Sequence, residues 1–229
     1  MIFSNIKSNF SNVIIYGFIT FFCYIYFIKH MYNYNYGGDF TNKTTEPIRN
    51  KKTIKAIEMY LKSTNFRNYG LFKVQLNTGL RISDVVKLKY DDVFDKNGNI
   101  KKHISLTEKK TKKNRIIFIN NELKTVCKEL KDYFDIKSGQ YLFKSRKGQN
   151  KPLTTTQVHR IYQSVGKIFN LDNFNSHSLR KTFCYFIYQK NKDINLIMKI
   201  MNHSSAAITL RYIGITDDDI DDIYSSLDF

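Results

Sequence analysis

The sequence contains little proline, glycine or cysteine for a chain of 229 residues. Only 2 Pro and 10 Gly are present, which excludes a fibrous chain or one dominated by linkers. The 3 Cys are odd in number and widely spaced, so they provide neither a disulfide framework nor a CxxC zinc pair. This cysteine usage favours a reducing cytoplasm. Cys127 and Cys184 fall on apolar faces of predicted helices, where we expect them to be buried.

Acidic residues are also scarce relative to basic ones. There are 37 Lys and Arg against 20 Asp and Glu, a formal net charge of +17. Residues 46–216 carry 34 basic and 13 acidic residues, a net +21, whereas 217–229 hold six Asp and no basic residue. A body this basic attracts polyanions, either nucleic acid or an anionic membrane surface. The 42% hydrophobic and 15% aromatic content excludes wholesale disorder and suffices for one to two domains.

One uncharged apolar run stands near the N-terminus, at Val13–Ile28. It is shorter than the roughly 20 apolar residues that a membrane-spanning helix needs. Three interpretations stay open: a marginal membrane anchor, a buried segment of a small extra element, or coding sequence upstream of a start at Met31. We predict that residues 1–45 form an apolar segment and linker, and that 46–229 form the globular domain with an acidic tail.

Hydrophobic periodicity and turn residues predict a mostly helical globular part. The predicted helices span 51–63, 69–77, 82–89, 121–134, 154–169, 177–189, 194–201 and 205–212. Two strands, 100–106 and 115–119, are predicted to be joined by a basic hairpin loop. Gly79 suits the position just after the end of a helix. The predicted fold class is therefore α+β, mainly helical, with a small antiparallel sheet.

Two sequence segments place basic side chains where they could hold phosphate. Arg81, in NTGLRISD, follows a glycine-ended helix and could bind a phosphate with two parallel hydrogen bonds, or could pair with Asp84. The segment Lys109–Arg115 has five basic residues in seven. Such a hairpin tip could track DNA phosphates, with one lysine as a general acid, or could be a solvated charge run.

Two further segments carry histidines. In HSLR, His177 and Arg180 are three residues apart and share a helix face, so both could reach one phosphate. Alternatively, His177 caps its helix and Arg180 forms an ion pair. In NHSSAAITLRY, Tyr212 follows His203 by nine residues, although with 16 Tyr in the chain an isolated tyrosine is usually structural.

Taken in order, an Arg, a basic hairpin, an HxxR and an H-x8-Y resemble the catalytic domain of the tyrosine recombinase (phage integrase) family. The resemblance covers about Glu46 to Tyr224 and is nearest to short integrase-like proteins of low-GC Gram-positive bacteria and their mobile elements. It implies that fold, DNA strand breakage and rejoining, and double-stranded DNA as partner. It implies neither a metal ion nor another cofactor.

The resemblance also implies roles for individual residues. Tyr212 would be the nucleophile, with Arg81 and Arg180 holding the non-bridging oxygens of the scissile phosphate. Lys110 would be the catalytic hairpin lysine, with Lys109 and Lys112 as alternatives. His177 would be the proton-transfer partner of the nucleophile. His203 would be the second histidine, which donates a hydrogen bond to the phosphate. Further DNA contacts are expected from Lys109, Lys112, Lys113, Arg115 and Lys181.

The chemistry of this set is coherent. A free tyrosine has a pKa of about 10, so attack at neutral pH needs a nearby base and cations. Fixed arginine and histidine donors stabilise the charge that develops on the phosphate oxygens. A lysine can protonate the leaving 5′ oxygen. The product would be a 3′-phosphotyrosine, which conserves the bond energy, so rejoining needs no ATP.

The family resemblance also suggests how the chain assembles. Ile220, Ile223 and Leu227 give the acidic tail an apolar stripe, suited to packing on a neighbouring protomer of a homo-oligomer, a tetramer on DNA. The alternatives are a tail docked in cis and a disordered tail. Larger family members carry a separate core-binding domain, and residues 1–45 are too short and too apolar to form one. A chain without that domain could rely on a partner recombinase. Alternative functions are a DNA-binding accessory module, a type IB topoisomerase-like enzyme and a membrane-tethered basic protein.

Overall fold

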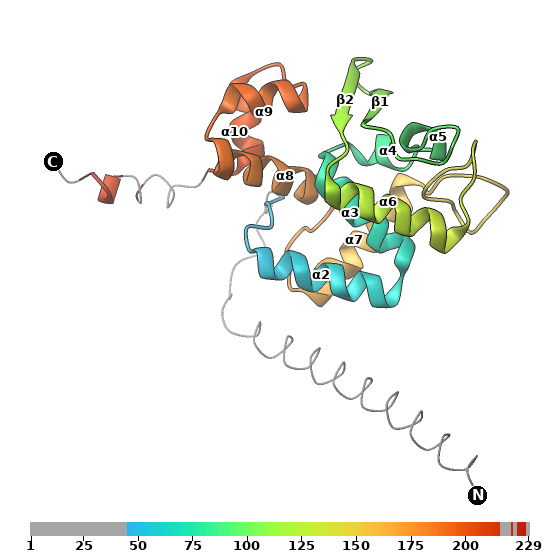
Figure 1. Cartoon of the computed structure of the whole chain (residues 1–229). Coiled ribbons are helices and arrows are strands. Elements are labelled where there is room, and N and C mark those ends of the chain that lie inside the picture. The colour runs from blue at the N-terminus through green and yellow to red at the C-terminus, as the bar shows by residue number, and fades with distance from the viewer. Residues whose placement is uncertain (1–44, 216–220, 222–223, 228–229) are drawn as a thin grey trace, which may run out of the picture.

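The computed structural model describes residues 45–215, 221 and 224–227 (Figure 1). The apolar run at 13–28, and Ile220 and Ile223 of the acidic tail, lie outside the described residues, so the predictions made for them stay predictions. In the described ranges, no helix combines the length and hydrophobicity needed to cross a membrane.

The described part is mainly helical with one two-stranded antiparallel sheet, which confirms the predicted fold class. The strands are β1 (His103–Thr107) and β2 (Asn114–Phe118). The helices are α2 (Lys51–Thr64), α3 (Phe66–Thr78), α4 (Ile82–Val85), α5 (Tyr90–Val93), α6 (Asn121–Phe134), α7 (Thr155–Ile168), α8 (Ser176–Asn191), α9 (Ile194–Met201) and α10 (Ala206–Ile213).

Polar side chains at the helix starts explain why the elements begin where they do. Asn65, Thr154, Asn175 and Ser205 each accept a hydrogen bond from a backbone N–H in the first turn of α3, α7, α8 and α10. Such caps satisfy backbone donors that have no partner within the helix. The predicted helix bounds therefore agree with the structure to within a few residues for these elements.

The helix predicted over 82–89 is wrong in its second half. α4 ends at Val85, and the chain then turns so that the Leu88 carbonyl accepts from the Leu142 amide at 2.9 Å. Lys89 forms an isolated β-bridge with Tyr141. Pairing with this distant loop satisfies backbone groups that a longer helix would have used, so tertiary contacts override local preference.

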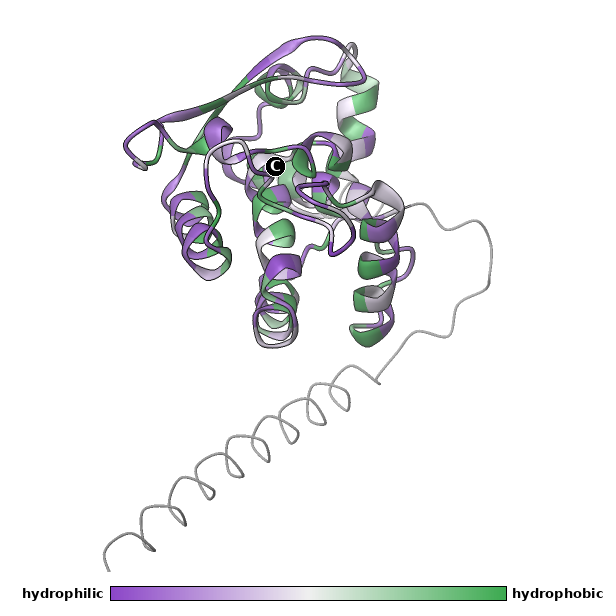
Figure 2. Ribbon diagram, turned by 90° about the vertical axis from the view of Figure 1, so that its right-hand side faces the viewer, coloured by the Kyte–Doolittle hydropathy of each residue, from purple (hydrophilic) through white to green (hydrophobic). Residues whose placement is uncertain are grey.

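Two hydrophobic clusters hold the fold together. The larger includes Leu71 and Phe72 of α3, Leu130 of α6 and Tyr162 of α7, all fully buried. The smaller joins Cys184 of α8, Ile197 and Met201 of α9, and Ile213 of α10. Figure 2 shows hydrophobic and hydrophilic residues mixed along each helix, as expected when one face is buried.

The structure confirms the predicted burial of two cysteines. Cys127 and Cys184 are buried free thiols, one in each cluster. Burial raises the pKa of both thiols to about 12, so neither is a nucleophile at neutral pH. They act as small hydrophobic residues in the core.

Candidate active site

A tight turn after α3 brings the first predicted arginine beside α8. Gly79 adopts a left-handed φ of 58°, as the sequence predicted for a residue after a helix. A Cβ at this position would lie 2.6 Å from Cε1 of Phe183, so only glycine fits against α8. The Gly79 carbonyl accepts a hydrogen bond from Arg180, and Arg81 follows two residues later as the N-cap of α4.

Arg180 is buried in the wall of the site, with 1% of its surface exposed. Its guanidinium donates to the carbonyls of Gly79 and Met201 rather than to a carboxylate, so the ion-pair alternative is wrong. Desolvation, with the charges of Arg115 and Arg81, lowers the pKa of Arg180 to about 10, which leaves it cationic at pH 7. Within the described residues its Nε has no hydrogen-bond partner. That nitrogen is itself inaccessible to solvent, so the N–H groups left for an anionic ligand are the second ones on Nη1 and Nη2.

Arg81 pairs with a residue that the sequence analysis missed. Its Nη1 donates to Oε2 of Glu108 at 2.6 Å, so the alternative pairing with Asp84 is wrong. Glu108 is fully buried and also accepts from Thr111 Oγ1 at 2.7 Å. Burial alone would raise the pKa of Glu108, but hydrogen bonds from Thr111 and Arg81 outweigh it and hold the pKa below its usual value. The sequence did contain one signal for this partner, because Glu108 is the single acidic residue between Asp95 and Glu122.

Arg115 does not lie where the sequence predicted. It was expected to contact DNA, but only 6% of it is exposed, and it donates to Glu108 at 3.2 Å and to the Thr78 carbonyl at 2.9 Å. Residues alternate between the two faces of β2, and this alternation puts Arg115 on the inner face with Ile117. The structure therefore contradicts the predicted DNA contact and makes Arg115 an internal partner of Glu108.

The hairpin loop brings only some of its lysines to the site. Lys110 and Lys113 line the candidate pocket together with Thr111, whereas Lys109 and Lys112 do not. Lys112 closes the loop with a left-handed φ of 56°, although no glycine stands there. Lys181 on α8 also lies outside the pocket lining. Among the lysines proposed for catalysis, the geometry therefore favours Lys110.

His177 stands at the rim of the same pocket. Asn175 caps α8 through its side chain, so the alternative in which His177 is the cap is wrong. The His177 side chain is exposed, one helical turn before Arg180. Partial desolvation and the charges of Arg180, Arg81 and Lys110 lower its pKa below the usual value. The imidazole is therefore neutral at pH 7 and able to accept a proton.

His203 and Tyr212 contact each other in the same pocket. Their ring centroids are 4.7 Å apart, and the Arg180 guanidinium lies 5.8 Å from the Tyr212 ring centroid. Nδ1 of His203 is 3.0 Å from the hydroxyl of buried Thr209, a partner that sequence reasoning also missed. Desolvation and the charges of Arg180 and Arg81 lower the pKa of His203 to about 4, so it is neutral at pH 7.

One pocket of about 500 Å³ unites these side chains. All six residues predicted to be catalytic line it: Arg81, Lys110, His177, Arg180, His203 and Tyr212. They come from the N-cap of α4, the hairpin loop, α8, the loop before α10, and α10 itself. Among the described residues, no group of three or more His, Cys, Asp or Glu side chains is placed to hold a metal ion. The arrangement offers a hydroxyl, two imidazoles and several cations around one space.

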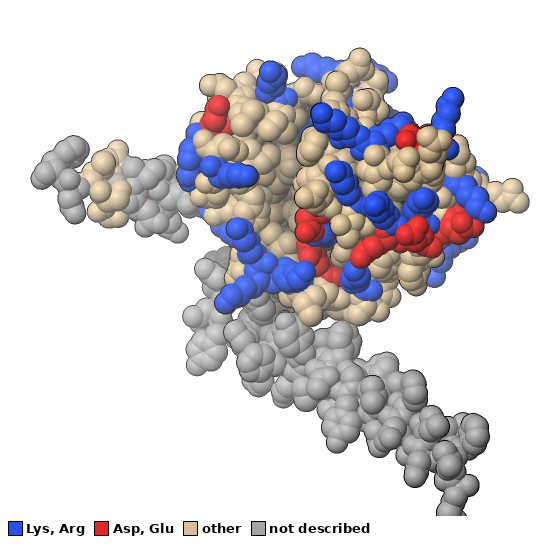
Figure 3. All heavy atoms as spheres, in the orientation of Figure 1, with Lys and Arg blue, Asp and Glu red and all other residues tan. Residues whose placement is uncertain are grey.

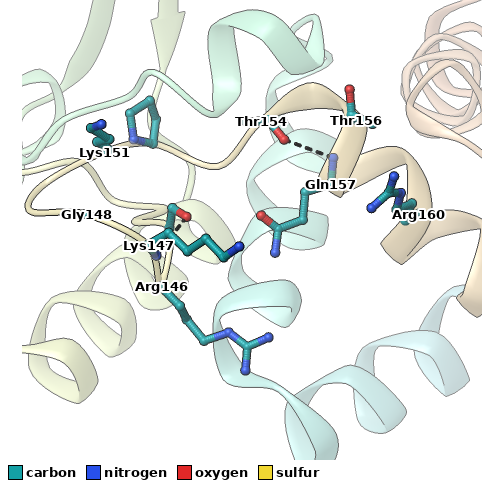
Figure 4. A pocket seen from close by; sticks show the side chains of 10 residues that line it. Arg146, Lys147, Gly148, Lys151, Thr154, Thr156, Gln157 and Arg160 are labelled. Atoms are coloured by element: carbon teal, nitrogen blue, oxygen red, sulfur yellow. Dashed lines mark hydrogen bonds between the residues drawn. The ribbon is translucent and has the colours of Figure 1, made fainter.

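A second pocket, of about 770 Å³, lies between the loop at 145–152 and α7. Its lining includes Arg146, Lys147, Lys151 and Arg160 and has no acidic residue. In Figure 4, Lys147 extends from the loop toward Gln157 on α7, while Arg160 lies one turn further along the helix. This pocket is larger, but its lining has no tyrosine, histidine or carboxylate. The candidate catalytic side chains line the smaller pocket, and the larger one suits an anion.

Basic residues are widespread on the surface as well. Figure 3 shows Lys and Arg side chains scattered across the visible face, with most of the acidic side chains gathered in a band near α6. The basic side chains are therefore not confined to the two pockets. A polyanion that reached the candidate active site could have contacts well beyond it.

Comparisons with known proteins identify the family and the fold. The family model described as "Phage integrase family" matches residues 48–218. A "Probable integrase/recombinase YoeC" of Bacillus subtilis is 42% identical over 174 residues, which is 76% of this chain and 91% of the relative. "Tyrosine recombinase XerH" of Campylobacter jejuni is 30% identical over 159 residues, covering 68% of this chain and 43% of that protein.

Solved structures show the same fold. A crystal structure of XerA recombinase superposes with a TM-score of 0.65 at 23% identity, covering 82% of this chain and 68% of that one. XerH bound to a palindromic difH substrate gives a TM-score of 0.63 at 20% identity, covering 81% of this chain and 54% of the other. The chain thus spans most of the Bacillus relative but about half or less of several longer recombinases.

Proposed function

The chain belongs to the phage integrase family, and on that premise we propose that it cuts and rejoins DNA through a covalent bond between Tyr212 and a 3′ phosphate. The observation that carries the proposal is the meeting of Tyr212, His203 and Arg180 in one pocket. We assign this chemistry to a catalytic domain at residues 46–229. It needs neither a metal ion nor ATP.

The first step is attack of the Tyr212 oxygen on the scissile phosphorus. His177, neutral at pH 7, accepts the phenolic proton as the O–P bond forms. The bond from phosphorus to the 5′ oxygen breaks, and Lys110 donates a proton to that leaving oxygen. A free 5′ hydroxyl and a 3′-phosphotyrosine result, and the reverse attack by another strand's 5′ hydroxyl rejoins the DNA.

The non-bridging oxygens receive donors from three side chains. Arg180 and Arg81 each retain guanidinium N–H groups beyond those that they give to backbone carbonyls and to Glu108. His203 contributes an N–H when Thr209 donates to its Nδ1, which leaves the proton on Nε2. Preorganised donors of this kind stabilise the charge that develops in the transition state.

Double-stranded DNA is the proposed substrate. Proteins of similar fold have solved structures with DNA, among them XerH bound to a difH substrate and the Tn1549 transposon integrase in complex with circular intermediate DNA. In this chain, the exposed hairpin lysines and Lys181 would contact phosphates beside the cut. The basic pocket at Arg146, Lys147 and Arg160 would hold the backbone further along.

The proposed working state is a homo-oligomer, a tetramer on DNA, joined through the C-terminal tail. Of the apolar residues in that tail, Leu227 is described and is exposed. A partner recombinase could take the place of other copies. Deleting residues 217–229 should abolish assembly on DNA in gel-shift titrations; unchanged assembly would exclude the tail as the connector.

A suicide substrate that contains a nick tests the proposed chemistry directly. DNA flanking the gene is incubated with the full chain, and covalent adducts are resolved on denaturing gels. We expect an adduct with the wild type and with Tyr133→Phe, an exposed tyrosine outside the pocket, but none with Tyr212→Phe.

Other outcomes identify other functions. Salt-dependent DNA binding without any adduct from the wild type would indicate a DNA-binding accessory module. Relaxation of supercoiled plasmid without site preference would indicate a type IB topoisomerase-like enzyme. Either result would overturn the recombinase proposal.

A further inference from the structure

Glu108 links two parts of the candidate active site that are distant in sequence. One carboxylate oxygen accepts from Arg81 at 2.6 Å and from Thr111 Oγ1 at 2.7 Å, and the other accepts from Arg115 at 3.2 Å. The side chain of Glu108 is completely inaccessible to solvent. It therefore joins the start of α4, the hairpin loop and β2 through a single group.

Charge explains why a carboxylate is needed there. Arg81 and Arg115 both point their guanidinium groups at Glu108, and both are close enough to Arg180 for their charges to lower its pKa. Three cations in a poorly solvated wall repel one another unless an anion lies between them. Glu108 is the described carboxylate that forms ion pairs with two of the three. Without it, Arg81 would be expected to swing toward solvent.

The hairpin loop is anchored by the same group of residues. The Lys109 amide donates to Asp84 at 3.1 Å, and Asp84 lies on α4 one turn after Arg81. Within the loop, the Glu108 amide donates to the Lys113 carbonyl at 3.0 Å, and the Lys112 amide donates to the Glu108 carbonyl at 2.9 Å. Both termini of the loop that carries Lys110 are thus held at Glu108.

We propose that Glu108 is a positioning residue, which fixes the Arg81 guanidinium and the Lys110 loop as one unit so that both reach the same phosphate. This inference rests on the proposed function, because Lys110 and Arg81 act there on one phosphodiester. Thr111 completes the unit, since its hydroxyl ties the residue next to Lys110 to the Glu108 carboxylate. Glu108 itself would not touch DNA, because it is fully buried.

The kinetic test uses Glu108→Gln, which keeps the shape and removes the charge. At saturating suicide substrate, we expect the single-turnover cleavage rate to fall about 100-fold, the cost of a misplaced group in a preorganised site. DNA affinity should change little, because the exposed lysines remain. Glu108→Asp, which keeps the charge, should recover part of the rate.

Glu58→Gln is the matched control. Glu58 is also a buried carboxylate paired with a cation, 2.8 Å from Lys73, but it lies outside the candidate pocket. We expect it to lower thermal stability without slowing cleavage at temperatures where it is folded. If both glutamine variants slowed cleavage in proportion to their loss of stability, Glu108 would have only a structural role and the proposal would be overturned.

Hydrogen exchange tests the proposal without any need for cleavage. In the wild type, the amides of Lys109 and Lys112 are hydrogen-bonded and should exchange slowly. In Glu108→Gln they should exchange faster, while amides in α6 keep their protection. Unchanged protection in the variant would refute the positioning role even if the wild type cleaves DNA. A wild type that forms no adduct, with loop protection still dependent on Glu108, would count against the proposed function alone.

Discussion

Replacing Gly79 by alanine tests how the arginine pair is assembled. The φ of 58° at this position costs a residue with a Cβ about 1–2 kcal/mol. The new Cβ would also overlap the Phe183 ring, 2.6 Å from Cε1 and 2.9 Å from Cγ. Overpacking of this kind typically costs about 1–3 kcal/mol. We therefore expect Gly79→Ala to lower the free energy of unfolding by about 2–5 kcal/mol.

Gly139→Ala separates the two contributions. Gly139 has a left-handed φ of 80°, but a Cβ there would meet no atom within 4 Å. Urea unfolding of both variants, followed by circular dichroism, should therefore show the larger loss for Gly79→Ala, by about the 1–3 kcal/mol of overpacking. Adding Phe183→Leu should recover part of that difference.

The same substitution should affect activity as well as stability. The Gly79 carbonyl accepts from Arg180, and Arg81 follows two residues later, so a displaced turn would move both arginines. At a temperature where both variants are folded, we expect Gly79→Ala to slow suicide-substrate cleavage by about 100-fold and Gly139→Ala to leave it unchanged. Equal stability losses for the two variants, or unimpaired cleavage by Gly79→Ala, would refute this account of the turn.

Three other predictions concern the loop, the histidine and the basic pocket. Lys112→Gly should raise the free energy of unfolding, measured in urea, by up to about 1 kcal/mol. The reason is that Lys112 adopts a left-handed φ of 56°, which glycine tolerates. A lower free energy of unfolding would contradict this prediction. Because the pKa of His203 falls from 6.5 to about 4 on folding, wild-type stability should decrease as the pH drops from 6.5 toward 4, and His203→Gln should show a shallower decrease. Arg160→Gln should weaken DNA binding and reduce the slope of log affinity against log salt by about 0.9 for each lost phosphate contact, whereas Lys167→Gln on the same helix should not.

Much of the site could be predicted because it is encoded in short local patterns. The spacing of His177 and Arg180 implies one helix face, and both side chains line the pocket. Gly79 marks the end of α3 through a conformation that only glycine adopts easily. Each of these inferences depends on backbone geometry within a few residues, which sequence specifies well.

The internal partners of the site could not be predicted in the same way. Glu108 and Arg81 are 27 residues apart in sequence, and Thr209 lies on α10 whereas His203 lies in the loop before it. Such pairs depend on how separate elements pack. Their residue types, a glutamate and a threonine, are common in surface loops as well.

The sequence by itself determined the basic charge of the body, most helices, the hairpin and the six candidate residues that line one pocket. Only the tertiary structure decided which charged groups face the pocket and which face inward. Arg115 belongs to the basic run but points into the protein, because alternate residues of β2 face opposite sides. Glu108 directly precedes that run and becomes the buried partner of two arginines, because burial removes water and leaves opposite charges to satisfy one another.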